Sequence, residues 1–127
     1  MGVTVRLYVA SAFSNKPEVH EVQAAVINAG HTISHDWTTE DASHLPAGSP
    51  EFYAYLEECG VRDFVGVLSA DAVIVIAHPD MGDTKAELGI ALGLGMPVFV
   101  LYPERKHCVF YGYTKRVNSI PELLASL

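Results

Sequence analysis

The sequence predicts a single flavodoxin-like, Rossmann-like α/β domain with three layers: a central parallel sheet between two layers of helices. Segments with strand patterns alternate with segments with helix patterns along the 127 residues, and such alternation produces a parallel sheet through right-handed crossovers. Residues 72–77 and 97–102 are continuous apolar runs, which is typical of central strands buried on both faces. The length corresponds to one domain, and we therefore expect residues 1–127 to fold as one unit.

The individual elements follow from apolar spacing and from helix start and stop signals. Pro17 opens one helical pattern and Gly30 ends it, and Ser49-Pro50-Glu51 begins another pattern that Gly60 and Gly66 weaken. In chain order we expect strand 3–10, helix 17–30, strand 32–35, a polar loop over 38–50, helix 50–68, strand 72–77, helix 84–94, strand 97–102, an aromatic segment 108–117 with a short fifth strand, and a last helix from 119.

The expected strand order is 2-1-3-4-5, the common order for five strands, which places the first and third strands side by side at the topological switch point. Ligands of such sheets bind beyond the carboxyl ends of the strands at that point. The loops that meet there are residues 11–16 and 78–83. The sequence therefore predicts the functional site between these two loops.

Composition limits the classes of partner. The formal net charge of −7 argues against a nucleic-acid polymer or an anionic membrane surface, since each requires a basic face. Neither a signal peptide nor a membrane-spanning run is visible, and the two cysteines form no disulfide framework. We expect a cytoplasmic protein. The histidines are not at metal-ligand spacing and no dinucleotide or Walker pattern is present, so we expect neither a metal nor a cofactor.

The most informative segment runs from Asp71 to Gly89. It places one acid at the start of a buried strand and a second acid, Glu87, in the first turn of the next helix. Spacing alone favours Glu87 over Asp71 for the crevice, because Asp71 comes at the opposite end of its strand. An alternative interpretation is that Thr84-x-x-Glu87 is a capping box, in which both side chains satisfy backbone N–H groups at the helix start.

A longer sequence motif favours the site role of Glu87 over the capping role. Thr84-Lys85-Ala86-Glu87-Leu88-Gly89, followed by Gly95-Met96-Pro97-Val98, resembles the Gly-Thr-x-x-Glu-Leu-Gly and Gly-Lys-Pro-Val signature of the nucleoside 2-deoxyribosyltransferase family, which includes nucleoside monophosphate N-glycosidases. Tyr8-Val9-Ala10-Ser11 is similar to the first-strand signature of that family. Asp63 and Asp71 match its Asp–x7–Asp pair. The resemblance covers most of the chain and is strongest over residues 63–102.

The resemblance implies roles for particular residues. Glu87 would be the nucleophile that attacks the anomeric carbon, and Asp71 would hold the sugar or handle protons. The substrate-binding positions are expected to be Tyr8, Ser11, Asp63, Asp83 and Thr84. Asp83 replaces the usual Gly and would repel a substrate phosphate, which favours nucleosides over monophosphates, and Met96 replaces the usual Lys.

Two further groups of polar residues are candidates on chemical grounds. Ser11, Ser14 and Asn15 follow the first strand, where they would hydrogen-bond a sugar or phosphate, or else cap the following helix. Asp36 and Trp37 follow the second strand. The Trp37 indole would stack on a base whose polar edge pairs with Asp36, or else it seals an edge of the core.

The expected activity is cleavage or transfer of the N-glycosidic bond of (deoxy)nucleosides or their monophosphates through a covalent glycosyl-enzyme on Glu87. The choice between water and a second base as acceptor stays open, as do the base and the sugar. Two alternatives are a phosphoribohydrolase of the cytokinin-activating type, whose Pro-Gly-Gly run is absent before Asp83, and a non-catalytic nucleotide-sensing module in which Glu87 caps its helix.

We also expect a homodimer or a higher homo-oligomer. The aromatic cluster Phe110-Tyr111-Gly112-Tyr113 is either part of the core or a subunit interface. The family resemblance favours the interface, because an adjoining subunit commonly completes the active site in these enzymes. We therefore place residues 108–117 near a subunit contact.

Overall fold

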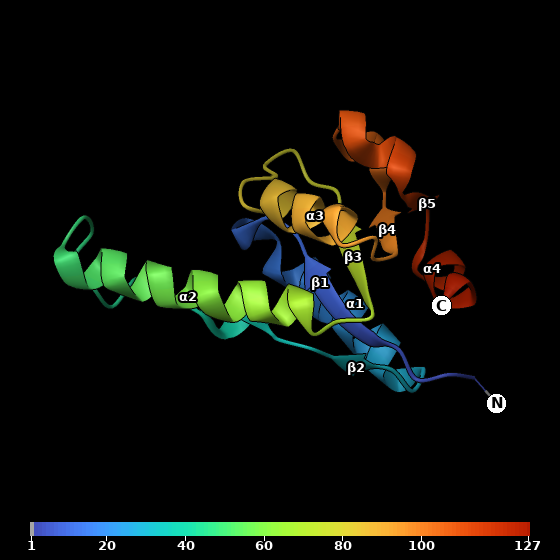
Figure 1. The fold of residues 1–127 in the computed structure, drawn as a ribbon, viewed down its shortest axis with the longest axis horizontal. Helices are drawn as coiled ribbons and strands as arrows, with labels where there is room; N and C mark the ends of the chain where they lie inside the picture. Colours follow the sequence, from blue (N-terminus) through green and yellow to red (C-terminus); the bar gives the residue numbers. More distant parts are fainter. Residues whose placement is uncertain (1) are drawn as a thin grey trace.

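The computed structural model describes residues 2–127, which form a five-stranded parallel sheet covered by helices on both faces (Figure 1). The order is β2-β1-β3-β4-β5, and every neighbouring pair is parallel. The predicted fold class and strand order are therefore confirmed. The strands are β1 (Arg6–Ala10), β2 (Thr32–Ile33), β3 (Ala72–Ile76), β4 (Val98–Leu101) and β5 (Lys115–Val117).

Four α-helices form the two outer layers. Helices α2 (Pro50–Leu68) and α3 (Thr84–Gly93) pack together on one face of the sheet, and α1 (Lys16–Asn28) and α4 (Ile120–Ser126) pack together on the other (Figure 1). The strands between them carry the core: all five residues of β3 and all four of β4 are buried. The apolar runs that predicted central strands thus do lie in the two-sided core.

Helix starts follow the signals in the sequence. The Ser49 hydroxyl accepts a hydrogen bond from the Phe52 N–H at 3.2 Å, and the Ser119 hydroxyl accepts one from the Glu122 N–H at 3.1 Å. In both helices Pro occupies one of the first two positions, where no N–H is needed. After α3, Gly95 has a φ of +69°, a left-handed conformation that glycine adopts without steric cost.

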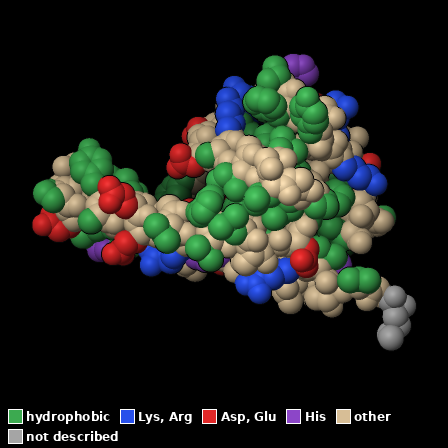
Figure 2. All heavy atoms as spheres, viewed as in Figure 1, with side chains coloured by type: hydrophobic (Ala, Val, Ile, Leu, Met, Phe, Trp, Pro, Cys, Tyr) green, Lys and Arg blue, Asp and Glu red, His purple; other side chains and the backbone are tan. Residues whose placement is uncertain are grey.

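Gly66 explains how α2 lies so close to the sheet. A Cβ atom at this position would lie 2.7 Å from the His35 Cβ and 3.0 Å from the Tyr8 Cε2. The glycine that weakens the helical pattern in the sequence is therefore the point where α2 touches the sheet. By contrast, the amino-terminal half of α2 projects beyond the sheet, and a hollow separates it from the main body (Figure 2).

Two regions differ in detail from the expected elements. Strand β2 has two residues in place of four, because the chain turns at Asp36 into a short 3₁₀ helix over Trp37–Thr39. The aromatic segment 108–117 forms a 3₁₀ helix over Val109–Tyr113 before β5. None of the helices formed by residues 2–127 combines the length and the apolar character needed to cross a bilayer.

Candidate functional site

A cavity of about 690 Å³ opens at the carboxyl ends of β1 and β3, where the switch point predicted a site. Its volume falls in the ordinary range for small-molecule sites. Both predicted loops contribute walls, through residues 11–13 and 80–84. The remaining walls come from the segment after β2 and from one face of α2, neither of which the switch-point argument included.

Glu87 lies in the first turn of α3 and lines this cavity. Burial raises the pKa of its carboxyl to about 7; a hydrogen-bonding interaction with Tyr8 acts in the opposite direction, and the nearby carboxylates of Asp63, Asp83 and Glu40 add to the increase. Near neutral pH the carboxyl therefore exchanges between an acid and a nucleophilic anion. A pKa poised in this way is typical of groups that do chemistry.

The capping-box interpretation of Glu87 is wrong. Helix α3 begins one residue earlier than a box would require: Asp83 is the N-cap, Thr84 is already helical, and no side chain caps the helix start. The Glu87 N–H donates to the Asp83 carbonyl at 3.2 Å, and the Thr84 hydroxyl has no hydrogen-bond partner among the described residues. Both side chains are thus left available to the cavity.

Tyr8 stands beside Glu87 in the interior. Its side chain is fully buried in β1, and its hydroxyl forms no hydrogen bond of ordinary geometry with the described residues. Burial raises the pKa of the Tyr8 hydroxyl far above its usual value, and the nearby Glu87 carboxylate adds to this effect. Tyr8 is therefore a neutral hydrogen-bond donor next to Glu87, close enough to influence its pKa but not in a hydrogen bond of ordinary geometry.

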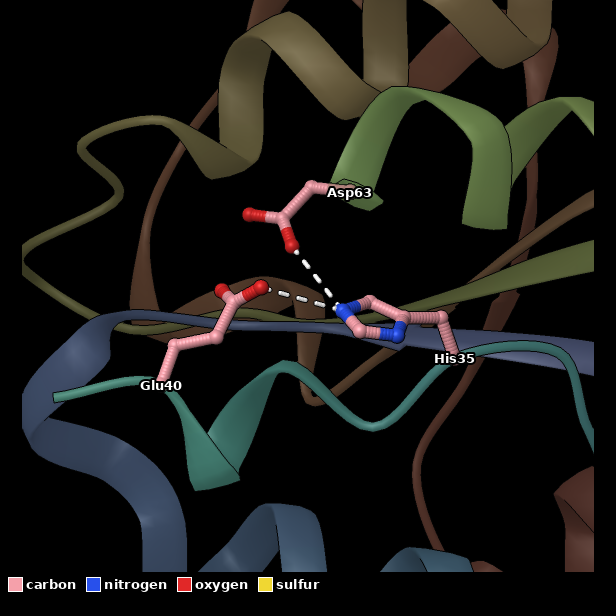
Figure 3. A group of neighbouring side chains, drawn as sticks. All are labelled: His35, Glu40 and Asp63. Carbon is pink, nitrogen blue, oxygen red and sulfur yellow. Dashed lines mark hydrogen bonds and ion pairs between the residues drawn. The ribbon is translucent and has the colours of Figure 1, made fainter. Parts of the chain in front are cut away.

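His35, Glu40 and Asp63 form a second group of side chains (Figure 3), of which Glu40 and Asp63 line the cavity. The His35 Nε2 lies 3.1 Å from the Glu40 Oε2 and 3.3 Å from the Asp63 Oδ1. Because the hydrogen bond from Nε2 is made to Glu40, the Asp63 Oδ1 is buried without one. Burial and the adjacent Glu40 carboxylate raise the pKa of Asp63, with a partial offset from His35. Asp63 thus tends to hold a proton.

These three side chains also offer ligands to a cation. One nitrogen and two carboxylate oxygens lie within 4.8 Å of one another, and mixed imidazole and carboxylate sets suit divalent transition metals. The sequence had given no metal-ligand spacing, because the three residues come from the segment after β2 and from α2. The same groups satisfy one another through the contacts described above, so the geometry does not require a metal.

Five of the predicted substrate-binding residues line the cavity: Ser11, Trp37, Asp63, Asp83 and Thr84. The Ser11 hydroxyl donates to the Ile76 carbonyl at 2.9 Å and accepts from Asn15, so it joins the ends of β1 and β3. The Trp37 indole N–H donates to the Val9 carbonyl at 2.7 Å. Trp37 therefore seals the core through its N–H and also borders the cavity.

The structure does not bring Asp71 or Asp36 to the cavity. Asp71 precedes β3 at the amino end, where its carboxylate accepts a hydrogen bond from the Arg6 N–H at 2.9 Å. Asp36 is the N-cap of the short helix after β2. Although burial opposes the change, hydrogen bonds from Thr38 and Gln23 lower the pKa of Asp36. Each carboxylate therefore forms hydrogen bonds within the fold, and neither lines the cavity in which it was predicted to act.

Sequence reasoning missed His35 and Glu40. His35 immediately precedes Asp36 and Trp37, which were considered for base contacts, but a single histidine carried no further signal. Glu40 falls in the polar loop after β2, where acidic residues are ordinary. His35 and Glu40 form a group with Asp63 only because α2 passes over β1 and carries Asp63 to them.

No protein-family model matches the chain, and no curated protein is significantly similar in sequence. Solved structures do resemble the chain in fold. A 2-deoxyribosyltransferase from Bacillus psychrosaccharolyticus has a TM-score of 0.68 and 21% identity, with 94% of this chain and 90% of that chain covered. The chain has the 2-deoxyribosyltransferase fold. The fold-level part of the predicted resemblance is thus confirmed.

Two further structures share this fold. The CMP N-glycosidase BcmB of Clostridium botulinum has a TM-score of 0.62 and 15% identity, over 95% of this chain and 96% of that chain. A conserved protein from Enterococcus faecalis V583 has a TM-score of 0.58 and 15% identity, over 97% and 96%. The coverage is nearly complete in each case, so the likeness extends over the whole domain.

Proposed function

We propose that this protein cleaves or transfers the N-glycosidic bond of nucleosides, with Glu87 as the nucleophile. The observation that carries the proposal is a carboxyl group with a pKa near 7 on the wall of the switch-point cavity, beside the unpaired hydroxyl of Tyr8. The shared fold with a 2-deoxyribosyltransferase and a CMP N-glycosidase supports the same class of reaction.

In the first step a Glu87 carboxylate oxygen attacks the anomeric carbon, and the bond between that carbon and the base nitrogen breaks. The electron pair leaves with the base, which takes up a proton. Asp63 is the proposed proton donor, since it lines the cavity and its pKa is raised. Glu87 and the sugar then form a covalent ester.

In the second step water or an acceptor base attacks the same carbon and releases Glu87 as a carboxylate. The proton that the incoming nucleophile loses returns to Asp63. Water as acceptor gives a hydrolase and a base gives a transferase. Tyr8 is proposed to donate its hydrogen bond to Glu87 or to the sugar, which would hold the nucleophile in the attacking position.

The test is base release from a panel of ribo- and deoxyribonucleosides and their monophosphates, with and without a second base, resolved by chromatography. We expect the wild type to release base, and Glu87→Gln to lose on the order of 10³-fold or more of this activity. Glu21→Gln, a matched change on the exposed face of α1, should behave as wild type. Base release that survives in Glu87→Gln would overturn the assignment of the nucleophile.

A further inference from the structure

The cavity is strongly one-sided in charge. Six carboxyl groups line it and, among its described lining residues, none is a lysine, arginine or histidine. The acidic residues come from every wall: Glu40 and Asp41 after β2, Asp63 on α2, Asp80 and Asp83 before α3, and Glu87 on α3. A net negative cavity of this kind attracts a cation and repels an anion.

Basic side chains that contact the lining residues are not themselves part of the lining. The Lys16 Nζ lies 4.1 Å from the centre of the Phe13 ring, and the Arg62 guanidinium lies 6.0 Å from the centre of the Tyr55 ring. Arg62 also lies 3.7 Å from the Glu40 carboxylate. The His35 ring also lies 3.1 Å from the Glu40 carboxylate and 3.3 Å from that of Asp63. These three basic side chains offset part of the negative charge, but none of them is among the residues that line the cavity.

Other features of the cavity indicate a flat organic ligand rather than a simple ion. Phe13, Trp37, Phe52 and Tyr55 line it, and aromatic faces attract organic cations. Thr84 is only 1% exposed, lines the cavity, and its hydroxyl has no hydrogen-bond partner among the described residues. A buried, unpaired hydroxyl in a cavity wall is satisfied when a ligand supplies the partner.

We propose that the preferred substrates are N-glycosides with a positively charged heteroaromatic base and no 5′-phosphate. This inference rests on the proposed function and narrows its substrate class. The carboxylates would attract the cationic ring, the aromatic side chains would contact its faces, and the Thr84 hydroxyl would bond the sugar. A 5′-phosphate would meet Asp80 and Asp83, which precede α3.

The chemistry of such a substrate suits the site. Glu87 attacks the anomeric carbon, the carbon–nitrogen bond breaks, and its electron pair neutralises the positive ring nitrogen. The base leaves as a neutral molecule and takes up no proton. During this step the positive charge moves from the ring toward the sugar, where the carboxylates continue to stabilise it.

The test compares two probes of nearly the same shape. Nicotinamide riboside is a cationic pyridinium glycoside, and 1,4-dihydronicotinamide riboside is its neutral counterpart. Binding to Glu87→Gln, which is expected not to turn either over, is measured by calorimetry. We expect the cation to bind about tenfold more tightly at low salt, and the ratio to fall as salt rises. Nicotinamide mononucleotide, with its 5′-phosphate, should bind more weakly than the riboside.

A second variant assigns the effect to the cavity. In the Glu87→Gln background, Asp80→Asn with Asp83→Asn should reduce the preference for the cation and improve binding of the mononucleotide, whereas Glu21→Gln should change neither. Equal binding of the two ribosides, tighter binding of the mononucleotide, or a preference unaffected by the double change would each overturn the inference.

Failure of this inference is distinguishable from failure of the proposed function. If neutral nucleosides release base in a Glu87-dependent way while the two ribosides bind equally, the function stands and the charge preference is wrong. If the cationic riboside binds preferentially but the wild type releases base from none of the glycosides, the preference stands and the glycosidase function is wrong.

Discussion

At the scale of single residues, the site depends on carboxyl groups that differ in environment. Glu87 and Asp63 are partly buried next to other acids, and the pKa of each is raised. Asp71 is hydrogen-bonded to the backbone at the other end of β3. Position in the fold therefore separates carboxyl groups of the same chemistry into the proposed nucleophile, the proposed proton donor and a structural contact.

The raised pKa of Glu87 predicts the pH dependence of the reaction. The reaction needs Glu87 ionised and the proton donor Asp63 protonated, and the pKa of each is raised to about 7. The kcat/KM for base release should therefore rise with pH toward about 7 and fall again at higher pH. The profile is measured with a nucleoside whose own ionisation lies outside this range. A flat profile between pH 5 and about 8 would contradict a nucleophile with this pKa.

The raised pKa of Glu87 also predicts that the stability of the folded protein falls as pH rises toward about 7. The folded protein binds the Glu87 proton more tightly than the unfolded chain does, so protonation of Glu87 stabilises the fold. This contribution to the free energy of unfolding is present at pH 4 and is lost as pH rises through about 7. A displacement from 4.5 to about 7 corresponds to about 3 kcal/mol. Urea unfolding should show Glu87→Gln gaining stability relative to wild type between pH 4.5 and about 7.5. A constant difference would contradict the buried environment.

Asp63 and Asp71 give a second prediction at this scale. Asp63→Asn removes the proposed proton donor and should lower base release from neutral nucleosides by about 10²-fold or more. Asp71→Asn should leave turnover unchanged and cost less than about 1 kcal/mol, because Asn keeps an oxygen that can accept from the Arg6 N–H. Steady-state kinetics and thermal unfolding check both variants. A large loss of turnover in Asp71→Asn would restore the role that the family resemblance implies.

At the scale of elements, α2 determines most of what the sequence did not reveal. It carries Asp63 to His35 and Glu40, and its amino-terminal half forms one wall of the cavity. Its approach to the sheet depends on Gly66, where the His35 and Tyr8 side chains fill the space of a Cβ. One small residue thus sets the position of a whole wall of the site.

Gly66 and Gly60 form a matched pair for testing this role. Both lie inside α2, but a Cβ at Gly60 would meet no atom within 4 Å. Gly66→Ala should destabilise the protein by about 1–3 kcal/mol through overpacking, whereas Gly60→Ala should stabilise it by about 0.5–1 kcal/mol through helix propensity. The free energy of unfolding in urea measures both. Equal effects of the two changes on the free energy of unfolding would show that the close contact at Gly66 does not restrict the residue at this position.

At the scale of the whole molecule, exposed apolar side chains gather on two surfaces of residues 2–127. The segment 108–117 exposes Val109 by 88% and Tyr113 by 78%, whereas Tyr111 is only 4% exposed. The aromatic cluster is thus partly in the core and partly on the surface. A second surface lies along α2, where Val61, Phe64 and Val65 are about half exposed or more. Large exposed apolar patches of this kind mark interaction surfaces.

We therefore expect self-association, with segment 108–117 near the contact. Light scattering at micromolar concentration should give at least a dimer mass, and Val109→Glu with Tyr113→Ser should shift it toward the monomer. Val61→Ser with Phe64→Ser tests the α2 surface in the same assay. A monomeric wild type with full activity would rule out a shared site. If only the α2 double change dissociates the oligomer, the interface lies on α2 and not on segment 108–117.

The sequence by itself determined the fold, because its signals are local. Apolar runs at 72–77 and 97–102 specify buried strands. A Ser followed within two residues by Pro specifies the helix starts at Ser49 and Ser119. The alternation of strands and helices specifies a parallel sheet and its switch point. The sequence also predicted that Glu87 lies at the crevice, because the first turn of the helix that follows β3 lies near the carboxyl end of that strand.

Only the tertiary structure decided which other side chains meet Glu87. The sequence pattern pairs Asp63 with Asp71 and gave the catalytic role to Asp71, but the path of α2 over β1 brings Asp63 to the cavity, and Asp71 lies at the amino end of β3. His35 and Glu40 join Asp63 for the same reason. Contacts between distant segments depend on how closely helix and sheet pack, and that distance is set by side-chain volumes such as the missing Cβ of Gly66 rather than by any local pattern.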